Sequence, residues 1–418
     1  MAPSRRQILL TGSALLGSGL LAACSSEGGS APASSSPAGT PAPAPSSSSA
    51  APAGPGPAGE PVAWPNTALV PHLFFHSLVV DPERAFDGDH KEAGYLDFMV
   101  TMDEFAAILP QLYAKGYVLV SPHELYEVGE DDVVRPKTLM VPENRTPLVF
   151  SLDDCSYYLY MEGDGFADRL IVDEDGRVRN EYTDAEGTTH VGSYDMVPML
   201  DDFLEEHPDF SLNGARGVLA MTGYDGVFGY RTSAREFGDS PTFDADVAAA
   251  TEVADAMKAT GWEFASHTWG HRTVPKLELD ELQRDMELWH GEVEPILGAT
   301  DMMIYPFGAD VARTGKYEAD NERYQYMRSL GYRSFFLVDG TAKAWGQLEP
   351  GYYRGSRINV DGISLEAAIS GKRPVLDEFF DSRSVLDPAR PASIRGTQQS
   401  PAAPPGGQSG SPSPSATG

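Results

Sequence analysis

Apolar strand-like runs alternate with helical patterns through the middle of this chain, and that alternation restricts the fold more than any other feature. A repeated strand–helix order is typical of a parallel sheet covered by helices. We therefore expect an α/β fold, in the form of a distorted (β/α)7-type barrel. The seven strand-like runs are Leu69–Phe75, Tyr117–Val120, Leu148–Leu152, Gly217–Met221, Trp262–Ser266, Met302–Tyr305 and Ser334–Val338.

Local signals place several helices between these runs. Thr101-Met102-Asp103-Glu104 is a capping-box sequence, and apolar residues follow it at helical spacing, with Pro110 as a defect inside the pattern. Ser121-Pro122-His123-Glu124 repeats the capping box, with proline at the first helical position. Further helices are expected near Tyr194–Glu206, Ala245–Ala259, Leu279–Leu297 and Asn321–Leu330.

One segment, at about residues 163–192, interrupts the first connection after the run that ends at Leu152. Two strand-like stretches, Arg169–Val172 and Arg177–Tyr182, flank the turn-rich sequence Asp173-Glu174-Asp175-Gly176. This pattern predicts a β-hairpin insertion. Loops after the strands surround the active site in parallel α/β folds, so the insertion is either a rim or lid of a site or a plain surface hairpin.

The two ends of the 418-residue chain have a different composition from its middle. Paired arginines, an apolar stretch and Leu21-Ala22-Ala23-Cys24 predict a twin-arginine-like lipoprotein signal over residues 1–23, with lipidation at Cys24. The alternative is a plain secretory signal with a chance cysteine. Residues 24–61 and 387–418 are rich in Ser, Ala, Pro and Gly, and we expect a disordered tether and a disordered tail. The catalytic domain is then residues 62–386.

Charge and cysteine content exclude several classes of protein. The formal net charge is −30, so binding to nucleic acid through phosphate neutralisation is not expected. The only cysteines are Cys24 and Cys155, which excludes a disulfide framework and a cysteine-based zinc cluster.

Carboxylates and imidazoles follow two of the strand-like runs. Asp153 and Asp154 end the run that begins at Leu148, and His267 and His271 follow the run that ends at Ser266. Histidines four residues apart share one face if the strand leads into a helical turn. Either pair alone is weak evidence. Together they supply two nitrogens and one oxygen to a metal and leave positions open, as in catalytic rather than structural zinc sites.

These segments resemble the motifs of the polysaccharide deacetylases (NodB homology, carbohydrate esterase family 4). Ser151-Leu152-Asp153-Asp154 resembles the first motif, His267-Thr268-Trp269-Gly270-His271 the second and Tyr305-Pro306-Phe307-Gly308 the third. They occur in the family's order, and the resemblance covers roughly Val70 to Val360, nearly all of the expected domain.

The resemblance implies a role for each matching residue. Asp154, His267 and His271 would bind a divalent metal, most often Zn²⁺, and Asp153 would be the general base. A backbone N–H near Tyr305 would bind the oxyanion together with the metal. Tyr305, Pro306, Phe307 and Trp269 are the candidate substrate residues, because sugar rings stack on aromatic faces.

The general acid does not follow the usual pattern, because no histidine occurs after His290. One branch of the family, similar to poly-N-acetylglucosamine deacetylases, carries this histidine on the first strand, where Leu73-Phe74-Phe75-His76 stands here. We therefore take His76 as the candidate acid. The alternative is that His76 caps a strand or packs in the core. Asp339 is a candidate to orient His76, or else a surface aspartate at a strand end.

Two further positions depart from the family motifs. Cys155 replaces the glycine that normally follows the Asp pair, and a buried inert thiol is its default interpretation. Ile304 stands where an arginine normally orients the base. Arg357 and Arg354 are available for that task, but the sequence does not place them.

The leading hypothesis is a metal-dependent hydrolase that removes N-acetyl groups from a cell-surface or cell-wall polysaccharide containing N-acetylglucosamine. It would be extracytoplasmic and would contact the membrane only through the lipid at Cys24. Two alternatives remain at this point: a non-catalytic saccharide-binding lipoprotein on the same barrel, and an O-acetyl esterase using the same metal site. The sequence does not indicate an oligomeric state.

Overall fold

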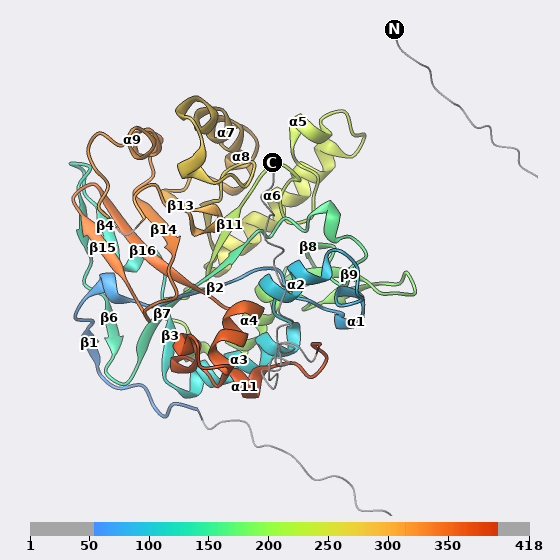
Figure 1. Cartoon of the computed structure of the whole chain (residues 1–418), viewed down its shortest axis with the longest axis horizontal. Helices are drawn as coiled ribbons and strands as arrows, with labels where there is room; N and C mark the ends of the chain where they lie inside the picture. The colour runs from blue at the N-terminus through green and yellow to red at the C-terminus, as the bar shows by residue number, and fades with distance from the viewer. Residues whose placement is uncertain (1–53, 314, 392–418) are drawn as a thin grey trace, which may run out of the picture. The chain divides into compact units, whose positions relative to one another are not determined.

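The computed structural model describes residues 54–391 apart from residue 314, and it contains a closed ring of seven parallel strands (Figure 1). The lipidation residue Cys24, the signal over 1–23, most of the tether and the end of the tail lie outside the described residues. Among the helices that are described, none has the length and apolar character to span a bilayer. The ring strands are β2 (His72–Phe75), β7 (Thr146–Asp153), β11 (Val218–Met221), β12 (Glu263–Ser266), β13 (Met302–Ile304), β14 (Ser334–Val338) and β16 (Tyr352–Asn359).

The ring closes between β7 and β11, where Leu219 is in register with Leu152. The distorted (β/α)7-type barrel is thus confirmed, but the seven strands differ from those expected. The run at Tyr117–Val120 forms β3 (Tyr117–Leu119), which pairs with the first half of β7 and stays outside the ring. The seventh position belongs to β16, which pairs with β14 on one side and β2 on the other.

The sequence analysis did not predict strand β16, because two arginines interrupt its apolar pattern. Arg354 and Arg357 are nevertheless completely buried. A buried guanidinium is tolerated when a carboxylate neutralises it and its N–H groups are bonded. Arg354 pairs with Asp310 at 2.9 Å, and Arg357 pairs with Asp153 at 2.6 Å. Both partners lie far away in the sequence, so local periodicity carries no sign of them.

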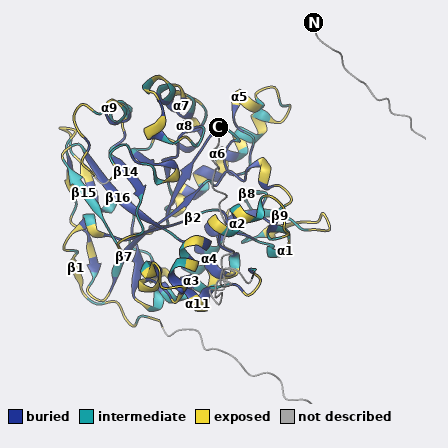
Figure 2. Ribbon diagram, viewed as in Figure 1, coloured by how far each residue is buried: buried dark blue, intermediate teal, exposed yellow. Residues whose placement is uncertain are grey.

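The side chains of the strands alternate between an inner and an outer core, as a side-chain period of two requires. Figure 2 accordingly colours most of the ring strands as buried. Along β7, Val149 belongs to the cluster inside the barrel, whereas Phe150 and Leu152 pack outward. Ser151 and Asp153 therefore continue the inner face toward the carboxyl end of the strand. Apolar side chains fill the middle of the barrel. Polar side chains line its mouth, the end at which the strands finish.

Helices cover the outside of the ring. They are α3 (Met102–Ala114), α4 (Met196–Glu206), α6 (Phe243–Thr260), α7 (Leu279–Glu292), α9 (Glu322–Ser329) and α10 (Gly362–Ile369). The capping box at Thr101 and Glu104 is present, and Pro110 lies inside α3 without ending it. The expected helix over 279–297 is divided into α7 and α8 (Glu294–Leu297), which has Pro295 in its first turn. The second capping-box sequence starts only a 3-10 turn, Pro122–Glu124.

The insertion forms a three-stranded antiparallel sheet rather than a simple hairpin. Its strands are β8 (Arg169–Val172), β9 (Val178–Thr183) and β10 (Thr189–Gly192), joined in the order β10-β9-β8. The first two strands match the expected hairpin. The sheet packs against α4 and α6, at the side of the barrel (Figure 1).

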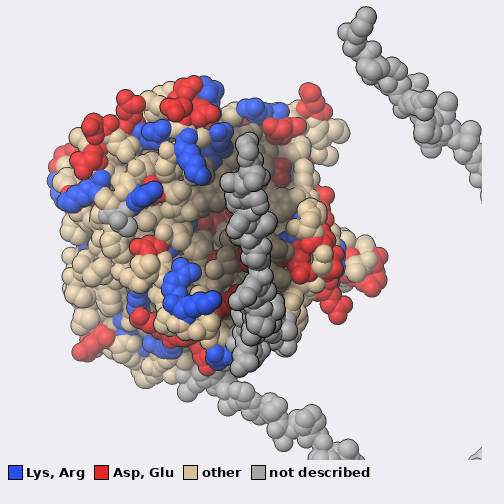
Figure 3. Space-filling model, viewed as in Figure 1, with Lys and Arg blue, Asp and Glu red and all other residues tan. Residues whose placement is uncertain are grey.

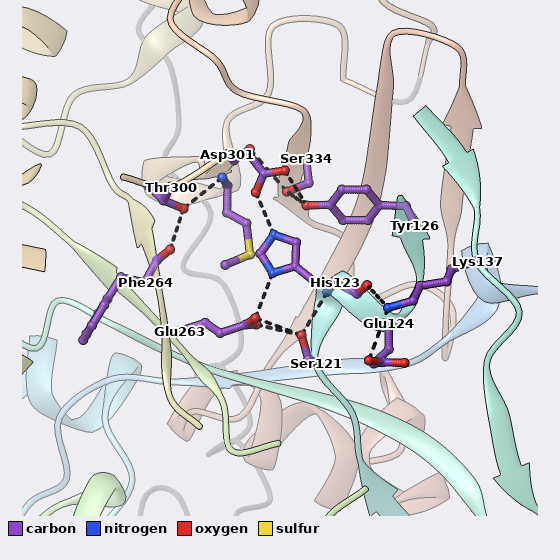
Figure 4. A network of polar contacts seen from close by, with 11 residues as sticks. Ser121, His123, Glu124, Tyr126, Lys137, Glu263, Phe264, Thr300, Asp301 and Ser334 are labelled. Carbon is purple, nitrogen blue, oxygen red and sulfur yellow. Dashed lines mark hydrogen bonds and ion pairs between the residues drawn. The ribbon is translucent and has the colours of Figure 1, made fainter. Parts of the chain in front are cut away.

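A polar network closes the end of the barrel at which the strands begin (Figure 4). The His123 ring lies between two carboxylates, with Nδ1 2.8 Å from Glu263 and Nε2 2.8 Å from Asp301. Both ring nitrogens must donate to bond two carboxylates, so the ring is an imidazolium. Tyr126 also donates to Asp301, at 2.9 Å. Burial lowers the pKa of His123, but the bonds to Asp301 and Glu263 outweigh it and raise the pKa to about 10.

This network predicts how the free energy of unfolding depends on pH. A histidine whose pKa is raised by folding stabilises the native state fully below its unfolded pKa of about 6.5 and loses that contribution as the pH rises through about 10. We expect the stability of the native protein to fall more steeply between pH 6.5 and 10 than that of His123→Gln, measured by urea unfolding. The exposed His90→Gln is the control. Parallel profiles for native protein and His123→Gln would contradict the assignment.

Candidate active site

Three metal-ligating side chains meet at the mouth of the barrel. Asp154 follows β7, and His267 and His271 follow β12. One potential ligand atom from each lies within 4.8 Å of the others, and this is the only such His, Cys, Asp and Glu group among the described residues. His271 Nε2 is 3.5 Å from Asp154 Oδ2. Two ligands bound to one zinc ion at tetrahedral angles are about 3.4 Å apart, so this donor set fits a divalent metal.

The two histidines converge through an irregular loop, and the expected helical turn is absent. Thr268 and His271 have φ values of 60° and 49°, in the left-handed region, so the chain doubles back after β12. Asp154 and Phe307 have positive φ as well, 61° and 58°. Non-glycine residues in this region cost about 1–3 kcal/mol each and persist where surrounding bonds hold them. Their concentration around one cavity indicates a functional site.

Asp285 holds the histidine loop in this conformation, a role that no local sequence pattern indicates. Its carboxylate lies on α7 and accepts hydrogen bonds from the N–H groups of Trp269 and Gly270, at 2.7 and 3.0 Å. These two residues stand between the ligating histidines, so the bonds fix the relative position of the two rings.

The hydrogen bonding of His267 leaves one ring nitrogen, Nε2, available to a metal ion. Its Nδ1 lies 2.7 Å from the carbonyl oxygen of Ile304 and must carry the proton there. Nε2 is then the lone-pair atom, directed toward the acids. Burial lowers the pKa of His267 to about 4, although Asp153 and Asp154 act in the opposite direction. The ring is therefore neutral at physiological pH, the form that binds metals.

A tyrosine that the sequence analysis overlooked orients Asp154. The Tyr158 hydroxyl donates to Asp154 Oδ1 at 2.6 Å and lies 2.7 Å from the Thr222 hydroxyl. Oδ2 remains free to face His271. Oriented carboxylates of this kind are typical of metal ligands with a supporting outer layer of hydrogen bonds.

The Asp153 carboxylate is bound by Arg357, which lies on β16. Arg357 Nη1 and Nη2 donate to Oδ1 and Oδ2 of Asp153 at 2.6 and 2.9 Å. Burial raises the pKa of Asp153, but the charge and hydrogen bonds of Arg357 outweigh it and bring the pKa to about 2. Asp153 is thus ionised at neutral pH and fixed in orientation. Arg357 thus makes the contact with Asp153 that was expected of an arginine at position 304, where Ile304 stands.

A cavity of about 340 Å³ joins these groups. Asp153, Asp154, His267, His271 and His76 all line it. The ring of His76 lies edge-on to Phe74, with centroids 5.7 Å apart. His72, four residues earlier in the chain, is buried, and its Nε2 is hydrogen-bonded to the Ser151 hydroxyl.

The remaining candidate residues fall in different places. Phe307 lines the cavity, with its ring 4.4 Å from that of His271. Tyr305 is completely buried and bonds Tyr317, and its N–H donates to Phe336 within the barrel. The Tyr305 N–H is therefore not available to bind the oxyanion, and Pro306 has no N–H. The backbone N–H of Phe307 is the remaining candidate for an oxyanion donor in this segment.

Trp269, Asp339 and Cys155 lie outside this cavity. Trp269 lines a neighbouring cavity and donates to Glu292. The Asp339 carboxylate accepts bonds from Thr341, two residues further on. Cys155 is a fully buried free thiol in the outer core, and burial raises its pKa well above the usual value. Its surroundings are those of an inert core residue.

Comparison with known proteins connects this geometry with a family. Residues 239–335 match the family model named polysaccharide deacetylase, a range that includes both histidines and the Tyr305-Pro306-Phe307-Gly308 segment. Over this segment the chain is similar to polysaccharide deacetylases. The likeness to the poly-N-acetylglucosamine branch stays a prediction.

Two solved structures resemble this chain at low sequence identity. The Streptococcus pyogenes deacetylase PplD, in complex with acetate, is 15% identical over 72% of this chain and 93% of its own, with a TM-score of 0.39. A polysaccharide deacetylase from Bacillus cereus is 15% identical over 70% of this chain and 65% of its own, with a TM-score of 0.35. The chain therefore covers slightly less than two thirds of the Bacillus protein. No curated protein matches the sequence.

The paired guanidinium bonds predict the effect of Arg357→Lys on this protein. Lysine keeps the charge but cannot hold both oxygens of Asp153. We expect kcat for acetate release to fall about 10- to 100-fold while metal content is retained, because supporting residues of this type have effects of that size. Arg354→Lys, on the same strand and in another buried pair, is the matched control. Equal kcat losses in the two variants would show that Arg357 acts only through the stability of β16.

Proposed function

We propose that this protein is a metal-dependent polysaccharide deacetylase, which removes N-acetyl groups from a glycan of the bacterial cell surface or wall that contains N-acetylglucosamine. The observation that carries the proposal is the grouping of Asp154, His267 and His271 beside the ionised Asp153. Zn²⁺ is the proposed metal, because two imidazoles and one carboxylate with open positions are the donor set of catalytic zinc sites. A bound metal supplies Lewis acidity, which polarises the acetyl carbonyl and acidifies water.

The chain's own residues then account for the proton transfers. Asp153 is ionised before the reaction and accepts the proton of the attacking water, and Arg357 fixes the direction of its carboxylate. Amide hydrolysis also requires an acid that protonates the leaving nitrogen. His76 lines the same cavity as Asp153 and is the proposed acid. The products are acetate and a free amine on the sugar.

Exposed aromatic side chains support a sugar as the substrate. Three aromatic residues line the cavity: Phe98, Tyr160 and Phe307. They are 48%, 49% and 67% exposed to solvent, respectively. Large apolar rings at such exposure around a polar site are suited to stacking against sugar faces. Phe98 ends α2 (Glu92–Phe98), and Tyr160 lies just before the insertion, so distant segments contribute to the rim.

Metal content and acetate release test this proposal together. In the zinc-treated protein, we expect Asp154→Asn and His267→Ala to lose the metal and the activity. Asp153→Asn should keep the metal and lose about 10²- to 10⁴-fold in kcat, the usual contribution of a general base. His290→Gln is the control, because His290 lies on α7 and bonds Glu294. The measurements are metal analysis and acetate release from N-acetylglucosamine oligomers.

The outcomes also separate the two other functions. A native protein without metal that still binds glycans would be a saccharide-binding lipoprotein. Activity toward O-acetylated glycans alone would identify an esterase that uses the same ligands. A saccharide-binding protein has no need of a carboxylate that Arg357 holds ionised beside these ligands, whereas either hydrolase uses it to abstract a proton from water.

We further propose that the chain is anchored outside the cytoplasm by a lipid at Cys24. The support is sequence alone: a basic start, an apolar stretch and Leu21-Ala22-Ala23-Cys24. Cys24→Ser should release the protein from the membrane fraction into the soluble fraction and leave its specific activity unchanged. Membrane association that persists in Cys24→Ser would contradict the anchor. Cys155→Ser is the control, because Cys155 is buried in the core.

A further inference from the structure

Asp195 is a completely buried aspartate at the N-terminus of α4, and the proton transfers proposed for the site do not involve it. Burial raises the pKa of its carboxyl group to about 6, although hydrogen bonds from Tyr157, Met196 and Leu78 act in the opposite direction. The carboxylate is therefore mainly ionised at neutral pH. These bonds come from neutral groups, two backbone N–H groups and a phenol. Because burying a charge is costly, the capping of one helix does not by itself explain this residue.

The two oxygens of Asp195 bind two different segments of the barrel mouth. Oδ1 accepts the N–H of Leu78 at 3.0 Å and the N–H of Met196 at 2.7 Å. Leu78 lies two residues after His76, the proposed acid. Oδ2 accepts the hydroxyl of Tyr157 at 2.7 Å. One carboxylate therefore joins the segment that follows β2 to the segment that follows β7.

Tyr157 lies in a strained turn beside the metal-ligating group. Its φ is 45°, in the left-handed region, where a non-glycine residue persists if surrounding bonds hold it. Asp195 binds its hydroxyl, and Arg231 donates to its carbonyl oxygen at 3.0 Å. The next residue is Tyr158, whose hydroxyl donates to Asp154. The conformation of this turn therefore determines the place from which the Tyr158 side chain reaches the metal-ligating carboxylate.

The inserted sheet extends this chain of hydrogen bonds through Asn180. Figure 3 shows acidic side chains over the insertion, at the right of the molecule, and its outer turns carry Glu174 and Glu186. Asn180 lies on β9 and is completely buried in spite of this polar surface. Its Nδ2 donates to the Tyr157 hydroxyl at 2.9 Å, and that hydroxyl donates to Asp195. The direction of each hydrogen bond is thus defined from the insertion to the buried carboxylate.

A second contact joins the insertion to the segment that follows β2. The carbonyl oxygen of Gly165 accepts the N–H groups of Val80 and Asp81, at 2.8 and 3.0 Å. A Cβ at position 165 would lie 2.4 Å from the carbonyl oxygen of Asp81, and the φ of Gly165 is 81°, so this approach requires glycine. The insertion therefore contacts both of the segments that Asp195 joins.

We propose that Asp195 is a positioning residue of the active site. Its bond to Tyr157 fixes the segment that carries His76 relative to the turn that orients Asp154. Asn180, on the insertion, supports this bond. The inference rests on the proposed function, because it concerns the same site, and it makes the insertion a lateral support of that site. A purely structural role would instead lower the free energy of unfolding and leave the geometry of the site unchanged.

Asp195→Asn and Tyr157→Phe remove the same bond with little change of shape. Asparagine still accepts the two backbone N–H groups through one oxygen, but its amide nitrogen cannot accept the tyrosine proton. We expect kcat for acetate release from N-acetylglucosamine oligomers to fall about 10- to 100-fold in each variant, with KM within about threefold and zinc content retained. The double variant should lose no more than the weaker of the two single variants, because both changes remove one bond.

The controls remove an equivalent bond at the opposite end of the barrel. There Tyr126 donates to Asp301 at 2.9 Å, so Asp301→Asn and Tyr126→Phe match the two test variants. Urea unfolding measures the loss of stability in all four variants. A loss of kcat in the test variants that is no larger than in the equally destabilised controls would overturn the positioning role.

A spectroscopic readout separates this inference from the proposed function, which fails if the native protein releases no acetate. The NMR signal of the isotope-labelled His76 ring, assigned by its absence in His76→Gln, should shift in Asp195→Asn and in Tyr157→Phe and stay in place in Asp301→Asn. Tyr157→Phe keeps the charge of Asp195, so a shift in Asp195→Asn alone is an effect of charge. That result, or a signal that moves in neither variant, overturns the positioning role whatever the activity.

Asn180→Leu tests the part played by the insertion. Leucine has a similar size but cannot donate to the Tyr157 hydroxyl. We expect kcat to fall at least about threefold and the His76 signal to shift in the direction seen in Tyr157→Phe. Arg177→Gln, an exposed change on the same insertion, is the control. If kcat or the signal keeps its native value, or changes equally in the control, the insertion is not a support of the site.

Discussion

The ion pair between Arg357 and Asp153 links the fold of this protein to its chemistry. Arg357 lies on β16, the strand that completes the barrel, and Asp153 ends β7. Both side chains are removed from water, so the guanidinium and the carboxylate each depend on the other to remain charged. Loss of either partner would leave an unpaired buried charge, at a cost of about 3–5 kcal/mol. The same pair leaves an ionised carboxylate directed into the mouth of the barrel, next to the metal-ligating group.

Around this pair, the site is built by residues that do no chemistry themselves. Tyr158 orients Asp154, the Ile304 carbonyl fixes the proton of His267, and Asp285 holds the strained loop between the histidines. Each bond selects one geometry for a ligand atom before any ion arrives, which reduces the reorganisation that binding requires. The insertion, in contrast, packs at the side of the barrel against α4 and α6. Its residues do not line the catalytic cavity, so the described structure shows a lateral sheet and not a lid.

The parts that the sequence predicted are those set by local pattern. Alternating strand-like and helical segments predicted the barrel, and ordered motifs indicated Asp154, His267 and His271 as candidate metal ligands. The parts that it could not predict depend on partners far along the chain. Arg357 fills the role left by Ile304 from a strand about fifty residues later, and only the barrel's closure brings it to Asp153. Tyr305 has the motif's sequence, yet its ring is buried and its amide bonds Phe336.

Anomalous diffraction from crystals of the zinc-bound protein would test the central claim most directly. The account predicts one zinc peak, about 2.0–2.2 Å from an Asp154 oxygen and from Nε2 of His267 and of His271, with Asp153 still bonded to Arg357. A peak bound by other residues, or an Asp153 that leaves Arg357 to ligate the ion, would contradict it.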